Sequence, residues 1–412
     1  MLQKRSARIV LVLGLVWVLV GLIAEPALAL TSAPDQTWRT KATDKGFALA
    51  QAGNTIFVGG KITNIYDETG ALVQSASALI AVDATSGEVI PSFDAQIAKA
   101  SGSPEVRALA VSADGSTLYV GGRFDTVGGQ PHKNFAAVNA ITGAVSGAVN
   151  LTVSNAVKAI LVGPDRVYFG GDFKKVDGRT RDYLAAMALD GTLDAAWLPS
   201  AGDGGSGVGV SIHSLEFAPD SASIFVGGLF RAMDGVTRMA VARVTSDTGA
   251  LHPWTIPAGT IDTGNQAWDL LVTPTRLFGG FGNGPNYVSA YRLDNGNTGS
   301  QAWKFNTVGN VQGLALHPNG TQLFVAGHFG TGALQQTVCG NQNLHGLMLV
   351  HKADIAPPTG RIDCSWLPQI SPFGTNFHGA WPLLMNGTQL WAGTKSKTIS
   401  GVTQSGFARW TL

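Results

Sequence analysis

A short apolar run that ends in two small residues recurs seven times along the chain. The first of the two small residues is glycine in five copies and alanine in two, and successive copies lie 47 to 66 residues apart. Copies at this spacing indicate that one supersecondary unit is repeated along the chain. The seven copies are centred on Gly59, Gly121, Gly170, Gly227, Gly279, Ala326 and Ala392.

Each copy lies inside a longer pattern of short strands and tight turns. An alternating stretch such as Val106 to Val111 precedes it, and a turn such as Asn319-Gly320 separates the two, because Asn and Gly tolerate positive φ. A third apolar run follows, and then a fourth run that commonly carries tryptophan, such as Trp197. Seven units of four antiparallel strands, without a helical period, predict an all-β chain folded as a seven-bladed β-propeller.

The two ends of the chain predict how such a ring closes. Phe407 to Leu412 has the character of the third strand of unit seven, and no fourth strand follows it. Trp38 precedes unit one much as the fourth-strand aromatic residues precede the later units. We therefore expect Thr37 to Thr40 to complete the last blade beside Phe407 to Thr411 and remove a free edge. The alternative is a loose N-terminal arm.

The N-terminal segment is typical of a secretory signal peptide. Lys4, Arg5 and Arg8 precede an uncharged run from Ile9 to Ala24, and Ala27-Leu28-Ala29 offers small residues for cleavage. The sequence thus predicts a signal peptide at residues 1–29 and a propeller at 30–412. An uncleaved anchor is the alternative, although the run is shorter than the roughly 20 residues that span a bilayer. The mature protein is expected to be secreted or on the cell surface, monomeric, and without a membrane span.

Composition agrees with this architecture and excludes some partners. The chain has 53 glycines, which the turns and the crowded inner strands require, and only 13% charged residues. Its 28 basic and 27 acidic side chains balance. Nothing in this charge pattern directs the protein toward nucleic acid or an anionic membrane.

The repeated pattern resembles two known repeat families. The Gly-Gly pair at the end of the second strand is similar to that of kelch-type propellers. The fuller pattern, with Gly170-Gly171, Asp177-Gly178 and Trp197 in one unit, resembles the delta-60-type repeat of secreted and cell-surface bacterial proteins. Phe225 to Pro257 repeats it. The resemblance implies a propeller outside the cytoplasm and implies no particular activity.

The chain has two cysteines, Cys339 and Cys364, and both lie in unit six. In an exported protein such a pair predicts a disulfide. Free thiols or copper ligation are the alternatives. Zinc ligation with His345 and His351 matches no finger spacing, so no metal site is expected.

The entry of the first strand in each unit is a candidate ligand-binding position. In a propeller this strand lies innermost, so the seven entries converge at one mouth of the central channel. Alignment of the units places a polar or aromatic residue there, followed by a small one. These residues can bind a carboxylate or a sugar that stacks on Trp268, or they can merely solvate the channel. They are Arg107, Lys158, His213, Trp268, Gln312 and His378, with Lys45 less clearly aligned in unit one.

A second repeated set lies in the loop after the Gly-Gly strand. Unit three carries Asp177, Arg179 and Arg181, which match Asp234 and Arg238 in unit four, with His132 at the matching place in unit two. Because one pattern serves several units, its expected role is structural. The Asp and Gly residues shape the turn, and the arginine pairs locally.

Known catalytic motifs are missing from the sequence. It contains no His-Glu-x-x-His, no Gly-x-Ser-x-Gly and no phosphate-binding loop. We therefore expect a binding module without cofactor that holds an extracellular protein, a glycan or a small ligand on the channel face. The alternative is a secreted carbohydrate-active enzyme, which needs two carboxyl groups about 5–9.5 Å apart at the channel mouth. A copper or quinone redox propeller is a weaker third hypothesis.

Overall fold

The computed structural model describes residues 33–35, 39–40, 44–67, 69–307, 309–328, 347–351, 362–371 and 379–412. The expected signal peptide, Trp38, Cys339 and His378 lie outside these residues, so the predictions that rest on them stay predictions. Within the described part, no helix is long and apolar enough to cross a membrane.

The repeated units form seven main sheets, and every strand pair in them is antiparallel. The predicted all-β class and antiparallel pairing are therefore confirmed. In chain order the sheets contain β2 (Lys45–Ala52), β3 (Thr55–Lys61) and β6 (Leu79–Asp83); β7 (Glu105–Val111), β8 (Thr117–Arg123) and β11 (Phe135–Asn139); β12 (Val157–Val162), β13 (Arg166–Gly171) and β16 (Leu184–Ala188); β18 (Ser211–Phe217), β19 (Ser223–Leu229) and β22 (Val241–Thr245); β23 (Gln266–Thr273), β24 (Arg276–Gly282), β25 (Tyr287–Arg292) and β26 (Gln301–Asn306); β27 (Val311–Leu316), β28 (Gln322–Gly327) and β29 (Leu347–His351); β31 (Ala380–Asn386), β32 (Gln389–Thr394) and β35 (Phe407–Thr411).

The expected fourth strand forms a regular ladder in one of these sheets, where β26 pairs with β25. Elsewhere in the described chain the fourth run makes at most a single bridge, such as Met187 with Leu193, while its aromatic side chain, such as Trp197, is fully buried. Proline explains much of this difference, because it lacks the N–H that a ladder needs. Units one, three, four and six carry Pro91, Pro199, Pro253 and Pro368 next to or near the aromatic residue, whereas β26 has no proline.

Five smaller sheets lie outside the main ones in the described part of the chain. Four include a tight two-strand hairpin that follows the Gly-Gly strand, and in unit one the hairpin is wider. The strands are β1 (Arg39–Thr40), β4 (Asn64–Tyr66) and β5 (Leu72–Ser75); β9 (Thr126–Val127) and β10 (Gln130–Pro131); β14 (Lys175–Val176) and β15 (Arg179–Thr180); β17 (Ala201–Gly202), β20 (Ala232–Met233) and β21 (Val236–Thr237); β30 (Ile370–Ser371), β33 (Thr398–Ile399) and β34 (Val402–Thr403).

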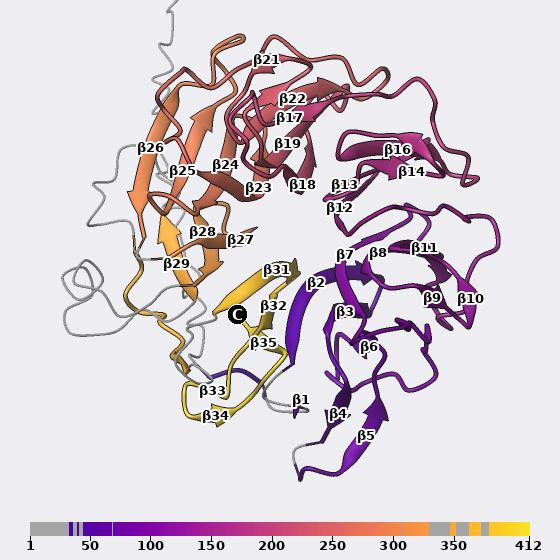
Figure 1. Cartoon of the computed structure of the whole chain (residues 1–412). Helices are drawn as coiled ribbons and strands as arrows, with labels where there is room; N and C mark the ends of the chain where they lie inside the picture. Colours follow the sequence, from indigo (N-terminus) through magenta and orange to yellow (C-terminus); the bar gives the residue numbers. More distant parts are fainter. Residues whose placement is uncertain are drawn as a thin grey trace, which may run out of the picture.

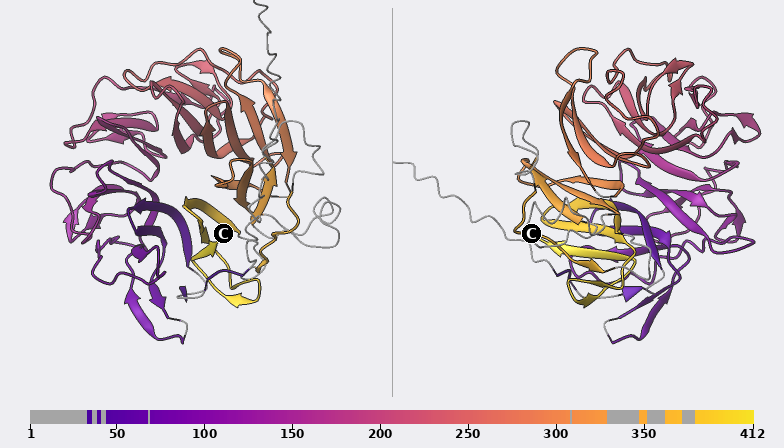
Figure 2. Two further views of the ribbon diagram at one scale, coloured as in Figure 1. Left: turned by 180° about the vertical axis from the view of Figure 1, so that it is seen from behind. Right: turned by 60° about the vertical axis from the view of Figure 1, so that its left-hand side comes forward.

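The main sheets follow one another around a central opening, with the first strand of each sheet nearest to it (Figure 1). Seen from behind, the sheets keep the same circular order (Figure 2). Each first strand contacts the first strand of the next sheet, from β2 to β7, β12, β18, β23, β27 and β31, and β31 contacts β2 again. Contacts between the sheets therefore return to their starting point.

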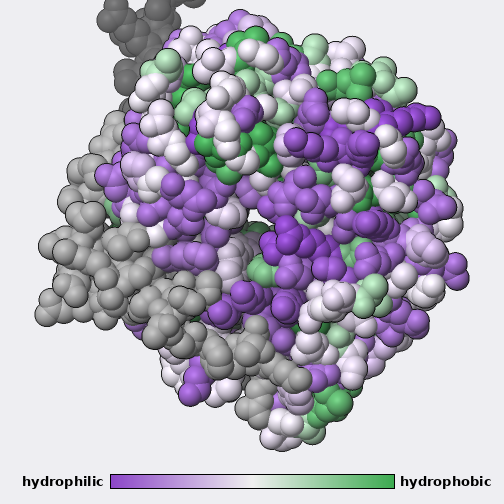
Figure 3. All heavy atoms as spheres, viewed as in Figure 1, coloured by the Kyte–Doolittle hydropathy of each residue, from purple (hydrophilic) through white to green (hydrophobic). Residues whose placement is uncertain are grey.

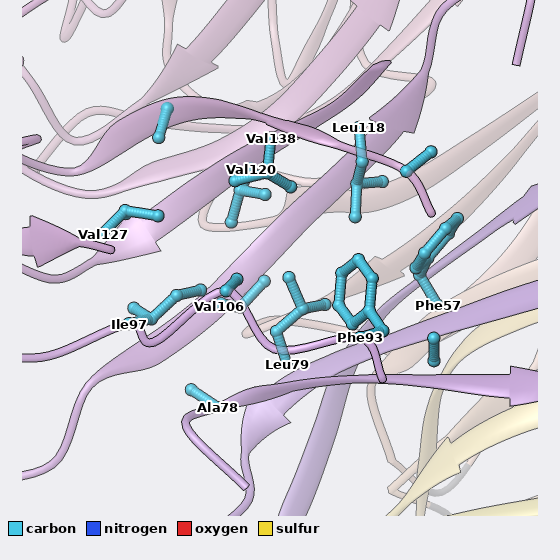
Figure 4. Close-up of a cluster of buried hydrophobic side chains, with 14 of the residues drawn as sticks. Phe57, Ala78, Leu79, Phe93, Ile97, Val106, Leu118, Val120, Val127 and Val138 are labelled. Atoms are coloured by element: carbon cyan, nitrogen blue, oxygen red, sulfur yellow. The ribbon is translucent and has the colours of Figure 1, made fainter. Parts of the chain in front are cut away.

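The hydrophobic core is divided among the spaces between consecutive sheets. Between the first and second sheets, Phe57 and Leu79 pack with Val120 and Val138 (Figure 4). The last space lies between the seventh sheet and the first, where Trp391 packs with clustered apolar residues that include Ile56. Each sheet thus buries apolar side chains on both faces, which accounts for the low share of charged residues.

The Gly-Gly pair allows two close approaches. A Cβ on Gly121 would lie 2.6 Å from Cγ1 of Val157 on the neighbouring sheet. A Cβ on Gly122 would collide with the backbone oxygen of Glu105 in its own sheet. The first glycine therefore brings two sheets together, and the second lets β7 cross close to β8.

Strand pairing shifts the centre of two repeats by one residue. In unit two, Val106 of the first strand pairs with Gly122. The counterparts of Val106 in units five and seven, Ala267 and Ala380, pair with Phe281 and Thr394. The residues that correspond to Gly121 are therefore Gly280 and Gly393 rather than Gly279 and Ala392. Sequence comparison could not detect this shift, because both units also carry a small residue at the earlier position.

The N-terminal segment contacts both the last strand and the first unit. The N–H of Asp35 donates to the oxygen of Arg409 in β35 at 2.8 Å, and the Asp35 carboxylate pairs with the Arg409 guanidinium at 2.7 Å. Arg39 and Thr40, however, pair with β4 and not with β35 as expected. The bond from Asp35 matches one from Asp194 to Ala186 in unit three, so Asp35 lies beside the last strand, whereas Arg39 and Thr40 lie beside β4 of unit one.

Candidate functional site

Every first strand carries a β-bulge near its entry, opposite the Gly-Gly pair of the second strand or the residues that correspond to that pair. A bulge leaves an extra residue outside the ladder and redirects its side chain. In β31 the irregular stretch covers two residues, Trp381 and Pro382. The bulged residues of the other six strands are Phe47, Arg107, Lys158, His213, Trp268 and Gln312.

All of these bulged side chains line one cavity of about 440 Å³. Five of the six residues named from the sequence are therefore brought together: Arg107, Lys158, His213, Trp268 and Gln312. The sixth, His378, lies outside the described residues. Lys45 also lines the cavity. Hydrophilic residues surround the central opening on the face seen in Figure 3.

Sequence alignment missed the aromatic members in the first and last units. The bulged residues there are Phe47 and Trp381, each a few residues after the aligned Lys45 and His378. In unit one the two-residue turn at 53–54 makes the hairpin two residues shorter than in unit two. Counting back from the Gly-Gly pair by the spacing of unit two therefore reaches Lys45 instead of Phe47. Turn length could have revealed the correct register.

Basic side chains come from the first three inner strands. The Arg107 guanidinium lies over the Phe47 ring at 4.7 Å and pairs with Glu105 at 2.6 Å. The Lys158 ammonium pairs with Asp172 at 2.7 Å and donates to Ser211 Oγ at 3.0 Å. Burial tends to raise the pKa of Asp172, but Lys158, Ser211 and Arg123 hold that pKa below its ordinary value. Together with Lys45, these groups make one side of the cavity basic.

The next three inner strands contribute neutral rings and amides. The rings of His213 and Trp268 lie 4.6 Å apart at 36°. Burial, and then the charge of Lys158, lower the pKa of His213 to about 3, so the imidazole is uncharged near neutral pH. In these three side chains, the atoms His213 Nε2, Trp268 Nε1 and Gln312 Oε1 are buried and lack a hydrogen-bond partner among the described residues.

Asp269 is the acidic member of the described lining. It occupies the position after the bulge, where units one to four and unit six have Ala, Ser or Gly. Its carboxylate accepts hydrogen bonds from Leu270 N at 3.0 Å and Leu314 N at 2.8 Å. Burial nevertheless raises the pKa of Asp269 to about 7. Burial and the charge of Asp269 also raise the pKa of Glu216, on the adjacent strand β18, to about 8.

No metal centre is formed by the described residues, since none of them make a cluster of three or more His, Cys, Asp or Glu side chains. The neutral His213 and the paired acids Glu105 and Asp172 interact with rings and basic groups instead.

No protein-family model and no curated protein matches the chain. Among solved structures, the extracellular domain of a one-component system from B. thetaiotaomicron matches with a TM-score of 0.52 at 15% identity. The match covers 89% of this chain and 39% of that protein. The computationally designed protein Ika8 gives a TM-score of 0.48 at 14% identity, over 92% of this chain and 100% of the designed chain. At these identities the likeness concerns the fold alone.

Proposed function

We propose that the chain is an exported seven-bladed β-propeller that binds an anionic sugar at its channel mouth. The cycle of contacts among seven inner strands supports the blade count, and the bond from Asp35 to β35 supports closure by the N-terminal segment. The predicted signal peptide supports export, and one similar structure is an extracellular domain.

The observation that carries the binding proposal is the convergence of one bulged side chain from each unit on a single cavity. Its basic side, from Lys45 to Lys158, suits a carboxylate, while the side with His213 and Trp268 suits the face of a sugar ring. The cavity volume lies within the range of small-molecule sites, roughly 300–1,000 Å³.

Calorimetric titration with glucuronate, and with glucose as the neutral counterpart, tests the proposal. Glucuronate should bind more tightly than glucose, and W268A should weaken binding about tenfold because the stacking surface is lost. W268F keeps a ring and should weaken it less. Glucuronate affinity should rise as pH falls from 8 to 6, because Asp269 loses its charge there while His213 stays neutral. Equal affinity for both sugars, or an unaffected W268A, would refute the proposal.

Asp269 favours a second candidate function, that of a carbohydrate-active enzyme. A carboxyl group with a pKa near 7 can serve as a general acid at neutral pH. Glycoside hydrolysis normally requires a second carboxyl group, and the described lining holds Asp269 alone. Release of reducing ends from an acidic polysaccharide, abolished in D269N, would favour the enzyme over the binding module.

A further inference from the structure

The hairpins of units three and four place two arginines in the same backbone position. The N–H of Arg181 donates to Lys174 O at 2.9 Å, and the N–H of Arg238 donates to Arg231 O at 3.0 Å. Both residues directly follow the second strand of their hairpins, β15 and β21. The repeat thus provides an internal comparison, in which differences between the two guanidinium groups arise from their surroundings.

In unit three the guanidinium has a structural role, as its repeated pattern predicts. Arg181 Nη2 donates to the backbone oxygen of Asp194 at 2.9 Å, and Nη1 donates to Thr180 O at 2.8 Å. The side chain is buried, with 6% of the residue exposed. It thereby fastens the hairpin to the fourth run of its own unit.

In unit four the corresponding contact is not formed. His252 occupies the place of Asp194, because its N–H donates to β22 at Arg243 O, 2.8 Å away, as Asp194 donates to β16. The Arg238 guanidinium instead donates through Nη1 to Thr237 O, at 2.9 Å. Its Nε is buried and has no partner among the described residues. Arg238 therefore retains a donor that is not used to hold its unit together.

A change in the fourth run explains the difference. Trp197 follows Asp194 by three residues, whereas Trp254 follows His252 by two, with Pro253 between them. After Trp254 the chain pairs with the next unit through Thr255 and Thr298, whereas after Trp197 it pairs through Ala201 and Met233. It encloses a cavity of about 380 Å³ that Arg238 borders.

The walls of this cavity are largely apolar. Met239 and Val241 contribute from the third strand and its approach, and Ile256 and Ile261 contribute from the segment after Trp254. Arg238 is the ionisable side chain in the described lining. The Arg238 guanidinium borders the cavity, and its Nη2 makes no hydrogen bond to the described residues. Such a group matches a carboxylate that carries an apolar body, because guanidinium and carboxylate form strong charge-assisted hydrogen bonds.

We propose that this cavity binds an apolar monocarboxylate whose carboxylate pairs with Arg238 and whose chain packs against Met239 and Ile256. A single guanidinium, with no other charged side chain in the described lining, suits one negative charge better than a phosphate. The site shares no residue with the channel-mouth cavity. It is therefore independent of the function proposed there.

Titration calorimetry with octanoate, and with 1-octanol as the uncharged counterpart, tests this site on the whole mature chain. Octanoate should bind saturably and at least tenfold more tightly than octanol, because a charge-assisted pair is involved. In R238Q the ratio of octanoate affinity to octanol affinity should fall at least tenfold. R179Q removes an exposed arginine of the neighbouring hairpin and should bind like the unaltered protein.

Three results would overturn the proposal: no saturable octanoate binding, equal affinity for octanoate and octanol, or unchanged affinity in R238Q. Thermal melting of each variant identifies any loss of folding. If R238Q does not fold, the comparison of octanoate with octanol on the unaltered protein still decides the question. Glucuronate binding at the channel mouth should be the same in R238Q, so failure of one site is distinguishable from failure of the other.

Discussion

At the scale of the residue, the first glycine of each pair determines how closely two sheets can approach. Gly121 leaves space for a methyl group of Val157, and Gly170 leaves the same space for Ile212, each 2.6 Å from where a Cβ would stand. Val157 and Ile212 both belong to the core between sheets. Because this core is closely packed, neither side chain can move away from an added methyl group without displacing its strand.

Replacement of Gly121 by alanine should therefore destabilise the protein. The added methyl group overpacks the space between the second and third sheets, which typically costs about 1–3 kcal/mol. G147A is the matched control, because nothing lies within 4 Å of a Cβ at that glycine and its φ is not positive. Thermal or urea unfolding of the two variants measures the effect. If G121A and G147A melt alike, close packing does not explain the repeated glycine.

At the scale of the element, the N-terminal segment supports a strand from the other end of the chain. Asp35 bonds to the backbone of Arg409, pairs with its guanidinium and accepts from Thr411 Oγ1 at 3.0 Å. The Arg409 side chain is only 9% exposed and also donates to Ala84 O at 3.1 Å. A charge this well enclosed depends on its partner.

A mature chain that begins at Ala42 should melt clearly lower than one that begins at Leu30, or should aggregate. It loses Asp35, and it exposes the edge of β35 and the buried Arg409 charge. A chain that begins at Pro34 keeps these contacts and should match the longer form. D35A alone should account for part of the loss, about 1–3 kcal/mol, through the unpaired arginine. Equal melting of the Ala42 and Leu30 forms would show that the segment does not close the last unit.

At the scale of the whole molecule, both ends of the described chain lie in the same unit. The bond between Asp35 and Thr411 places the N-terminal segment beside the final residues. The contacts among inner strands also return from β31 to β2. The break in the covalent chain therefore lies within a cycle of contacts among seven similar sheets, and we expect the chain to tolerate a break at another place in that cycle.

A circular permutant tests this symmetry. Leu412 is joined to Ala33 by a short flexible linker, and the chain is opened between Gly102 and Ser103, which are exposed and precede β7. The permutant should fold with a circular dichroism spectrum like that of the parent and a melting temperature within several degrees, since no core contact is broken. An unfolded or strongly destabilised permutant would show that the contacts between the seventh and first units cannot replace the peptide link.

The sequence by itself determined the features that depend on local chemistry. Repeated Gly-Gly pairs, turn residues and apolar runs specify short antiparallel strands, because hairpin pairing involves neighbours along the chain. The same regularity identified Arg107, Lys158, His213, Trp268 and Gln312 as one converging set. Each lies at the same place in its unit, so similar hairpins carry them to the same end of the strands.

Tertiary structure decided what depends on register and on contacts between distant segments. Bulge position selected Phe47 and Trp381 for the cavity, because pairing with the second strand, and not spacing, determines which residue leaves the ladder. Arg181 and Arg238 occupy equivalent places in the sequence, yet one binds a backbone oxygen and the other borders a cavity. The difference lies in the path of another segment, where unit four departs from the repeat, and the contacts made along that path depend on the next unit.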